Sequence, residues 1–258
     1  MSSDYAAPAR IDTFSMTSTS QLSIVQRLQA DQPAFHMGGN ARWDSLPDTL
    51  GAICRSVKPG DVTIETGVGA STVVFAERGA SHTAVSPDPD EHKLVRDYCQ
   101  KIGVDDSRIE FIVGLSDDVL PSLLGHDRTL DVAFIDGAHS FPFPELDWYY
   151  ITRSLKVGGQ LLMDDITISA VADVFEHMSL ESNWRLDGVF DDRAASFRLL
   201  APPMPEEWSM QPYNKRYPDF RFAAPQERLR LESAHRIQQV GRGLARRYPI
   251  LRRLRKRA

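Results

Sequence analysis

Short apolar runs alternate with longer helix-like segments through the middle of this sequence, and this alternation limits the fold more than any other feature. The runs are four to six residues long and are separated by segments with helical spacing of apolar residues. A strand–helix–strand repeat packs as a parallel sheet covered by helices, so the sequence predicts a doubly wound α/β domain. The expected strands are Val62–Thr66, His82–Ser86, Ile109–Val113, Leu130–Ile135 and Gln160–Met163, with helices expected at Thr72–Arg78, Asp90–Ile102, Val119–Leu124 and Pro144–Leu155.

The pattern changes after the fifth expected strand. A helix is expected at Ala170–Met178, followed by two β-like runs, Trp184–Phe190 and Ala195–Leu200, with Asp191-Asp192-Arg193 between them. Two such runs joined by a short polar turn indicate a β-hairpin that closes the sheet. Before the fifth strand, Gly158-Gly159 are expected to end the preceding helix. The predicted sheet therefore has about seven strands, most of them parallel.

The segment that precedes this alternation has a different character. Residues 1–45 are polar and mixed, and we interpret them as an N-terminal extension. The Rossmann-like domain is predicted to span residues 46–200. Its first helix is expected from Leu46 to Val57, with Asp44 or Ser45 as the capping residue.

The C-terminal part, residues 201–258, is set apart by its composition. Residues 201–225 are rich in proline and aromatic side chains and predict an ordered surface wrap, and residues 225–258 predict a basic helix interrupted near Gly241, Gly243 and Pro249. Residues 241–258 hold eight basic and no acidic residues, which leaves 22 basic residues against 35 acidic residues elsewhere. Basic residues interleaved with apolar ones are typical of an amphipathic segment on an anionic membrane or an acidic partner, although a solvated helix has the same pattern.

Composition excludes several protein classes. The hydrophobic fraction of 42% is ordinary for a globular core. Cys54 and Cys99 are too few for a disulfide framework, and no group of Cys and His has zinc-site spacing. Residues 1–14 lack a secretory signal pattern, and no apolar run approaches the roughly 20 residues of a membrane span. We therefore expect a cytoplasmic protein with no clear nucleic-acid signal; its oligomeric state, a homo-oligomer included, stays open.

The first expected strand runs directly into a glycine-rich loop and a helix start, in the stretch TIETGVGAST from Thr63 to Thr72. Gly67 and Gly69 permit a tight turn and let a ligand approach the backbone where a Cβ would intervene. Valine at position 67 is therefore expected to abolish ligand binding in a protein that still folds. A plain turn without a ligand stays open. So does a dinucleotide site, with Asp88 as the ribose acid, although Thr72 stands where a third glycine is needed.

Three carboxylates follow two strands that are expected to be neighbours. Asp136 ends one strand, and Asp164 and Asp165 end the next, so they should converge at the carboxyl edge of the sheet. A cluster of hard oxygen ligands suits Mg²⁺, or else Mn²⁺ or Ca²⁺, whereas the same acids can also act as helix caps or hydrogen-bond acceptors. His139 is a candidate general base, or alternatively a histidine hydrogen-bonded at the start of the next helix. Five aromatic residues are candidates for an acceptor pocket or for the core: Phe141, Phe143, Trp148, Tyr149 and Tyr150.

The region Asp131–Asp165, which contains AFIDGAHS and GGQLLMDD, resembles the fourth strand, helix and fifth strand of class I S-adenosylmethionine-dependent methyltransferases. The resemblance is greatest to small bacterial O-methyltransferases related to the metal-dependent catechol-type and antibiotic-sugar enzymes. It covers about residues 46–200 and includes both the glycine-rich loop and the acidic strand ends. It implies a Rossmann-like fold, S-adenosylmethionine as the methyl donor and methyl transfer as the reaction.

The resemblance also implies which residues hold the donor. The loop after the first strand would bind the amino-acid end, and the segment after the third strand would meet the adenine, where Leu115 replaces the family's common acid. At the ribose position Ser86 replaces the usual acid, which makes Asp88 a candidate substitute. A base found in some sugar enzymes falls at Ala138. The predicted donor-binding residues are Glu65, Gly67, Gly69, Ser71, Ser86, Asp88, Ser116, Asp117 and Asp136; the catalytic candidates are Asp136 and His139, and the metal ligands are Asp136, Asp164 and Asp165.

These inferences predict a methyltransferase that acts on a hydroxyl of a small molecule or sugar, because the acidic cluster favours an oxygen acceptor, with or without a divalent metal. The identity of the acceptor is not encoded in any motif. Two other classes stay open, an NAD-type dinucleotide-dependent oxidoreductase and a non-catalytic nucleotide-binding protein that acts through its basic tail. Ligand-dependent thermal stabilisation would separate the three classes.

Overall fold

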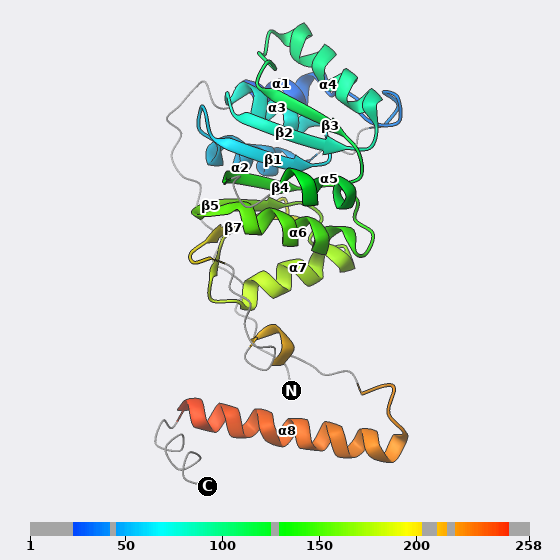
Figure 1. The fold of residues 1–258 in the computed structure, drawn as a ribbon, viewed down its shortest axis with the longest axis vertical. Helices are drawn as coiled ribbons and strands as arrows, with labels where there is room; N and C mark the ends of the chain where they lie inside the picture. The colour runs from blue at the N-terminus through cyan, green and yellow to red at the C-terminus, as the bar shows by residue number, and fades with distance from the viewer. Residues whose placement is uncertain (1–22, 42–44, 125–128, 203–210, 216–219, 248–258) are drawn as a thin grey trace. The chain divides into compact units, whose positions relative to one another are not determined.

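The computed structural model describes residues 23–41, 45–124, 129–202, 211–215 and 220–247. Internal contacts divide the chain into two units, residues 1–205 and residues 206–258. The first unit contains the sheet, and the second contains a short 3-10 helix and one long α-helix (Figure 1). The division at residues 45 and 200 that the sequence suggests stays a prediction.

The first unit is built on a seven-stranded sheet with the strand order β3-β2-β1-β4-β5-β7-β6. Strands β1 to β5 pair in parallel, and β7 pairs antiparallel with both β5 and β6. The doubly wound sheet and its closing hairpin are thus confirmed, and the reversal of strand order between β1 and β4 leaves a crevice at their carboxyl ends. The strands are β1 (Val62–Thr66), β2 (Ser81–Ser86), β3 (Ile109–Val113), β4 (Leu130–Ile135), β5 (Leu155–Met163), β6 (Trp184–Phe190) and β7 (Ala194–Leu199).

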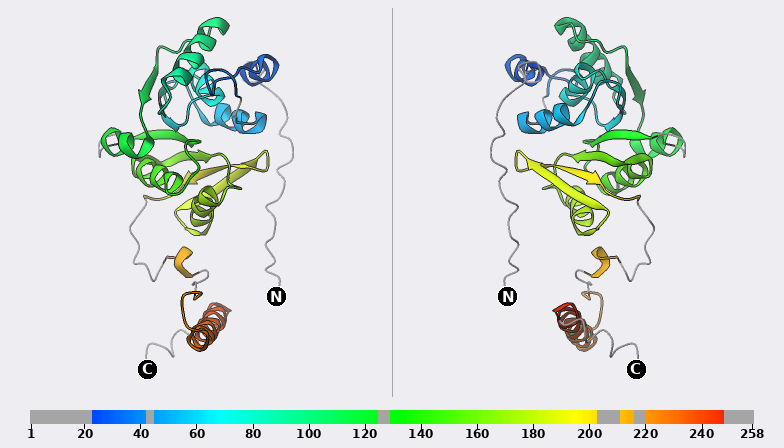
Figure 2. Two further views of the ribbon diagram at one scale, coloured as in Figure 1. Left: turned by 90° about the vertical axis from the view of Figure 1, so that its right-hand side faces the viewer. Right: turned by 90° about the vertical axis from the view of Figure 1, so that its left-hand side faces the viewer.

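Helices cover both faces of this sheet (Figure 2). One core cluster takes apolar side chains from α1 (Ser23–Asp31), α2 (Pro47–Ser56), α3 (Ala70–Glu77) and α4 (Pro89–Ile102). The other takes them from α5 (Ser116–Leu123), α6 (Phe143–Ser154) and α7 (Ser169–Leu180). Covering on both faces explains why most residues of the central strands β1, β2 and β4 are buried. Cys54 and Cys99 are buried in the first cluster and form no disulfide.

Helix α1 was not predicted from the sequence. Its residues Ile24, Val25 and Leu28 are buried in the first core cluster, together with Phe35 of the following loop. The helix is short, and polar residues dominate its outer face, so its apolar positions give only a weak periodic signal. Part of the N-terminal segment therefore packs in the core of the first unit.

The boundary between α6 and β5 differs from the prediction. The helix ends at Ser154 and the strand begins at Leu155, so Gly158 and Gly159 lie inside β5, and the prediction that they end the helix is wrong. A Cβ added at Gly159 would lie 3.0 Å from the backbone oxygen of Asp131. The pairing of β4 and β5 shifts its register at this place. The glycines therefore permit the close approach of two strands.

The N-terminus of α2 is capped from a distant turn. Leu46 occupies the N-cap without a side-chain hydrogen bond, so the expected cap by Ser45 is wrong, and Asp44 lies outside the described residues. Instead, Asp191 of the β6–β7 turn accepts hydrogen bonds from the Thr49 backbone N–H at 2.8 Å and from its hydroxyl at 2.9 Å. A carboxylate there satisfies unpaired N–H groups at the positive end of the helix dipole. This contact fixes the hairpin turn against α2.

The second unit contains η1 (Tyr213–Lys215) and α8 (Pro225–Arg247). Helix α8 continues through Gly241 and Gly243, so the predicted interruption there is wrong, while Pro249 lies outside the described residues. The wrap predicted for residues 201–225 lies partly outside them as well. Among the residues that the structure covers, no helix combines the length and the apolarity needed to cross a membrane.

Candidate functional site

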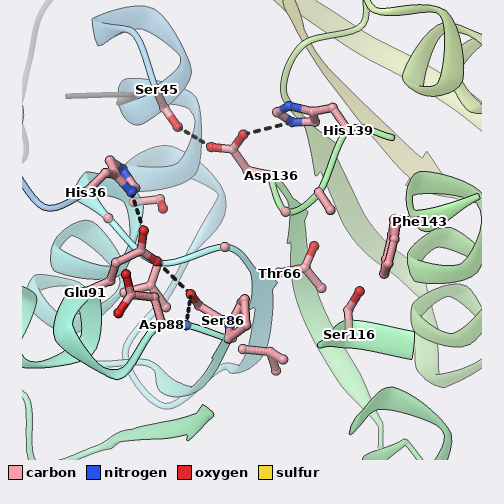
Figure 3. A pocket seen from close by; sticks show the side chains of 18 of the residues that line it. His36, Ser45, Thr66, Ser86, Asp88, Glu91, Ser116, Asp136, His139 and Phe143 are labelled. Carbon is pink, nitrogen blue, oxygen red and sulfur yellow. Dashed lines mark hydrogen bonds and ion pairs between the residues drawn. The ribbon is translucent and has the colours of Figure 1, made fainter. Parts of the chain in front are cut away.

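A cavity of about 760 Å³ opens at the carboxyl ends of β1, β2 and β4 (Figure 3). Its volume is in the usual range for small-molecule sites, and its position at the reversal of strand order is where ligands of open α/β sheets bind. The loops that follow four parallel strands form most of its wall. It is lined by His36, Ser45, Leu46, Thr66–Ser71, Val85–Asp88, Glu91, Gly114–Ser116, Asp136–His139, Phe143, Asp165 and Arg193.

The glycine-rich loop between β1 and α3 forms one wall of the cavity. Gly67 has a φ of +92°, in the left-handed region that side chains rarely adopt. A Cβ there would strike the backbone oxygen of Asp136 and would lie 2.9 Å from its carbonyl carbon. The glycine is therefore required for the approach of β1's loop to the loop after β4, in addition to any approach of a ligand.

Glu65 lies behind this loop and does not line the cavity. Its side chain is buried and accepts hydrogen bonds from the hydroxyls of Ser71, at 2.6 Å, and Thr72. His82 Nε2 lies 3.1 Å from the oxygen that also accepts from Thr72. The Thr72 hydroxyl also accepts from the Gly69 N–H at 3.0 Å. Glu65 thus holds the loop in shape from inside the fold.

A second acidic group, which the sequence analysis missed, lies at the end of β2. Glu91 in the first turn of α4 accepts hydrogen bonds from Ser86 Oγ at 2.7 Å and from His36 Nδ1 at 2.8 Å. Burial raises the pKa of Glu91, but the hydrogen bonds from His36 and Ser86 outweigh burial and leave the pKa below its usual value. Asp88 instead caps α4, because its Oδ1 accepts from the Asp90 N–H at 2.9 Å. Glu91 is therefore a fixed carboxylate on the cavity wall.

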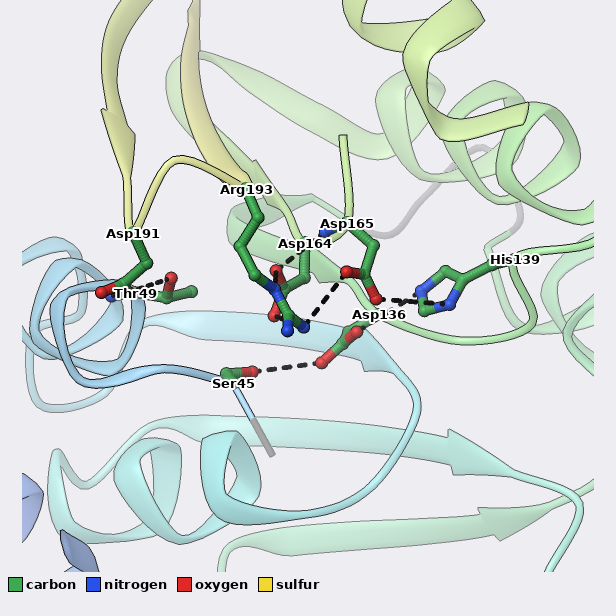
Figure 4. A network of polar contacts seen from close by, with 8 residues as sticks. All are labelled: Ser45, Thr49, Asp136, His139, Asp164, Asp165, Asp191 and Arg193. Carbon is green, nitrogen blue, oxygen red and sulfur yellow. Dashed lines mark hydrogen bonds and ion pairs between the residues drawn. The ribbon is translucent and has the colours of Figure 1, made fainter. Parts of the chain in front are cut away.

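The acidic strand ends form a network with Arg193 of the β6–β7 turn (Figure 4). Arg193 donates to both oxygens of the buried Asp164, at 2.9 and 3.1 Å, and lies 3.2 Å from Asp165 Oδ1. His139 lies between two carboxylates, with Nδ1 3.5 Å from Asp165 and Nε2 3.5 Å from Asp136. Ser45 donates to the second oxygen of Asp136 at 3.1 Å.

Two of these groups have pKa values that suit proton transfer. Burial, with the nearby charge of Asp164, raises the pKa of Asp136 to about 7. The contact with Asp136 raises the pKa of His139 above its ordinary value, in spite of burial. A histidine that faces a carboxylate, with a pKa raised above its ordinary value, is placed to accept a proton from a ligand.

An arginine occupies one of the three predicted metal ligands and contacts a second in this arrangement. Both oxygens of Asp164 are bonded to Arg193. Among the described residues, this leaves ligand atoms of Asp136, His139 and Asp165 within 4.8 Å of one another. Their spacing would admit an ion, but Asp165 also pairs with the Arg193 guanidinium. A metal would then share one carboxylate with a fixed positive charge, and like charges at such distances repel strongly.

The structure brings together most of the predicted site residues. The predicted residues that line the cavity are Gly67, Gly69, Ser71, Ser86, Asp88, Ser116, Asp136, His139 and Asp165, whereas Glu65, Asp117 and Asp164 do not line it. Of the five candidate aromatic residues only Phe143 reaches the cavity, while Trp148 and Tyr150 pack against the second core cluster. His36, Glu91 and Arg193 were missed. The one signal for Glu91 was an acid in the first turn of the helix after β2.

The part of the chain that forms most of this site matches a known protein family. Residues 64–166 match a family model described as a methyltransferase domain, and this range includes the glycine-rich loop and the three acidic residues that follow β4 and β5. A search of curated proteins finds no match to the chain.

Solved structures with the same fold include three O-methyltransferases. A proposed O-methyltransferase from Klebsiella pneumoniae has 16% identity and a TM-score of 0.55, over 72% of this chain and 92% of that one. TomG from Streptomyces achromogenes, an O-methyltransferase involved in tomaymycin synthesis and solved with S-adenosylmethionine, has 15% identity and a TM-score of 0.51, over 72% and 92%. An O-methyltransferase from Bacillus cereus, solved with S-adenosylhomocysteine, has 14% identity and a TM-score of 0.51, over 74% and 94%. These likenesses show the fold.

Proposed function

We propose that this chain, which has the class I methyltransferase fold and a methyltransferase domain at residues 64–166, transfers the methyl group of S-adenosylmethionine to a hydroxyl of a small molecule. One observation carries the proposal. A single cavity joins the glycine-rich loop, the carboxylate of Glu91 and a histidine held between two carboxylates. The first two suit the donor, and the histidine suits deprotonation of an acceptor.

The donor is proposed to lie across the carboxyl ends of β1 and β2. Its amino-acid end would contact the backbone of the loop from Gly67 to Ser71, which Gly67 allows to pack against the loop after β4. Its adenine would lie near Gly114–Ser116, which lines the cavity after β3. Its ribose would face Glu91, because an ionised carboxylate accepts hydrogen bonds from two neighbouring hydroxyls.

The ribose assignment makes a prediction that separates two neighbouring acids. Glu91→Gln is expected to weaken binding of S-adenosylhomocysteine about tenfold or more, because a hydrogen bond to a charged group contributes roughly 1.5–3 kcal/mol. Asp88→Asn is the matched control, since Asp88 caps α4 and its loss leaves the Glu91 carboxylate in place. Isothermal titration calorimetry measures both affinities. Equal affinity of wild type and the Glu91 variant would contradict the assignment.

The chemistry requires little beyond alignment and deprotonation. The acceptor oxygen attacks the methyl carbon in line with the carbon–sulfur bond, which breaks and leaves a neutral thioether, while the hydroxyl proton passes to the imidazole of His139. Asp165 faces one ring nitrogen of His139 and Asp136 faces the other, each at 3.5 Å. The imidazolium formed in the reaction would therefore be stabilised on both sides.

Ligand-dependent stability tests the proposed class of enzyme. S-adenosylhomocysteine is expected to raise the melting temperature, because a ligand that binds only the folded state stabilises it by mass action. NAD is expected to leave it unchanged, since the Thr72 side chain occupies the position of the third glycine of a dinucleotide fingerprint. Stabilisation by NAD and none by S-adenosylhomocysteine would favour the oxidoreductase instead. Stabilisation by neither ligand would contradict the proposed donor site.

The second unit supports a separate proposal, that the C-terminal segment contacts anionic lipid surfaces. Leu229, Ile237 and Val240 are more than half exposed and share one face of α8, and eight basic residues occur in residues 241–258. The full chain is expected to sediment with phosphatidylserine vesicles at low salt. A chain ending at Val240 is expected to bind them much less. Equal sedimentation of the two, or none of either, would rule out this role.

A further inference from the structure

Arg193 belongs to the β6–β7 turn, yet its side chain is bonded to a buried carboxylate. Its guanidinium bonds both oxygens of Asp164, whose side chain is fully buried, and its terminal nitrogen also reaches Asp165 (Figure 4). The bidentate pair uses the planar geometry that distinguishes arginine from lysine. Burial lowers the pKa of Arg193, but its bonds to Asp164 outweigh burial and raise the pKa above its usual value, so the side chain stays charged.

The backbone of Arg193 is held on both sides. Its carbonyl accepts from the Ile166 N–H at 2.8 Å, and its N–H donates to the Phe190 carbonyl at 3.1 Å. Two residues earlier, Asp191 is bonded to Thr49 at the start of α2. The guanidinium is therefore placed by the fold and does not depend on a ligand for its position.

The charges of the cluster are nearly balanced without any added ion. Asp136, Asp164 and Asp165 contribute up to three negative charges, and Arg193 and His139 contribute up to two positive charges. Asp165 contacts both cations at once, with one oxygen toward Arg193 and the other toward His139. Arg193 and His139 thus neutralise most of the negative charge with which three free carboxylates would attract a divalent cation.

We propose that Arg193 is the resident cation of this carboxylate cluster and acts as a positioning residue. It neutralises Asp164, holds Asp165 against His139 and supplies the positive charge that a divalent metal would otherwise supply. The cluster therefore binds no metal, and methyl transfer proceeds without one. The statement about the reaction rests on the proposed function. The statement about metal binding rests on the cluster alone.

Manganese binding tests this role without knowledge of the acceptor. Electron paramagnetic resonance can follow the unbound Mn²⁺ while full-length wild type and variants are titrated. Wild type and Arg193→Lys, which keeps the charge, are expected to show no site at the cluster. Arg193→Met removes the charge and is expected to create one site, which binds Mn²⁺ about a hundredfold more tightly than any residual binding by wild type. Adding Asp165→Asn to Arg193→Met is expected to remove that site again.

Arg198→Met is the matched control. Arg198 lies on the same hairpin and pairs with Asp187 at 2.9 Å, and neither residue lines the cavity, so its loss should create no manganese site. A wild-type site that Asp165→Asn removes would overturn the proposal, as would equal Mn²⁺ binding by the Arg193→Met and Arg198→Met variants. If Arg193→Met does not fold, wild type and Asp165→Asn decide the question, because only a metal site would make their Mn²⁺ binding differ.

Affinity for S-adenosylhomocysteine, measured on the same samples, separates this proposal from the proposed function. If the wild-type protein does not bind S-adenosylhomocysteine, the methyltransferase assignment is contradicted, while the conclusion from manganese binding still holds. Wild type that binds the donor and also binds Mn²⁺ at Asp165 would contradict the role of Arg193 alone. A merely structural arginine would change stability on substitution without changing the affinity for Mn²⁺.

Discussion

Replacing Gly67 with valine is expected to abolish binding of S-adenosylhomocysteine and to destabilise the protein by about 3 kcal/mol or more. The sequence predicts only the first effect, because it identifies the loop as a place of ligand approach. The structure adds the second, since a Cβ at this position strikes the backbone of Asp136 and the φ of +92° strains any side chain. Calorimetry and a thermal melt measure the two effects.

Gly60 provides the control for this variant. It has a φ of +85°, close to that of Gly67, but a Cβ there would meet no atom within 4 Å. Gly60→Val should therefore show the backbone strain without the collision and should bind S-adenosylhomocysteine as wild type does. Undiminished donor affinity in the Gly67 variant would refute the assignment of the loop.

Replacing His139 with glutamine is expected to lower turnover by about 10²–10⁴-fold, the usual contribution of a general base. Donor affinity should stay close to that of wild type, because His139 is assigned to the acceptor's proton. The measurement needs an acceptor, which a screen of hydroxylated small molecules with labelled S-adenosylmethionine can supply. Glutamine keeps the hydrogen-bonding capacity but takes up no proton, so unchanged turnover in this variant would remove His139 as the base.

The pH dependence of turnover provides a second check on His139. The imidazole must be neutral to accept a proton, so the rate should rise as pH increases through its pKa. Because the contact with Asp136 raises that pKa, the rise should occur at higher pH than for an ordinary histidine. Asp136→Asn removes the main cause of the shift and should move the rise to lower pH. A rate that falls over the same interval would contradict this role.

The sequence by itself determined the framework of this protein. Strands β1, β3, β4 and β6 have the predicted bounds. The signal is strongest at β4, because a run of apolar residues buried between two layers of helices is local and easily recognised. The strand-to-helix loop at Gly67 and the acids that end β4 and β5 were found for the same reason. Each lies beside an element whose direction the local pattern already fixes, and parallel strands bring their carboxyl ends to one edge.

Only the tertiary structure decided how the polar groups pair. Glu65 lies next to the last residue of β1, yet its carboxylate is bonded to Ser71 and Thr72 inside the protein, and Glu91 lines the cavity instead. The sequence predicts Arg193 only as part of a hairpin turn, whereas its side chain is bonded to Asp164, 29 residues earlier in the chain. Such pairings depend on which loops the packed helices bring together, and local periodicity contains no information about them. The pairing of Arg193 with Asp164 is therefore determined by the tertiary structure and not by the local sequence.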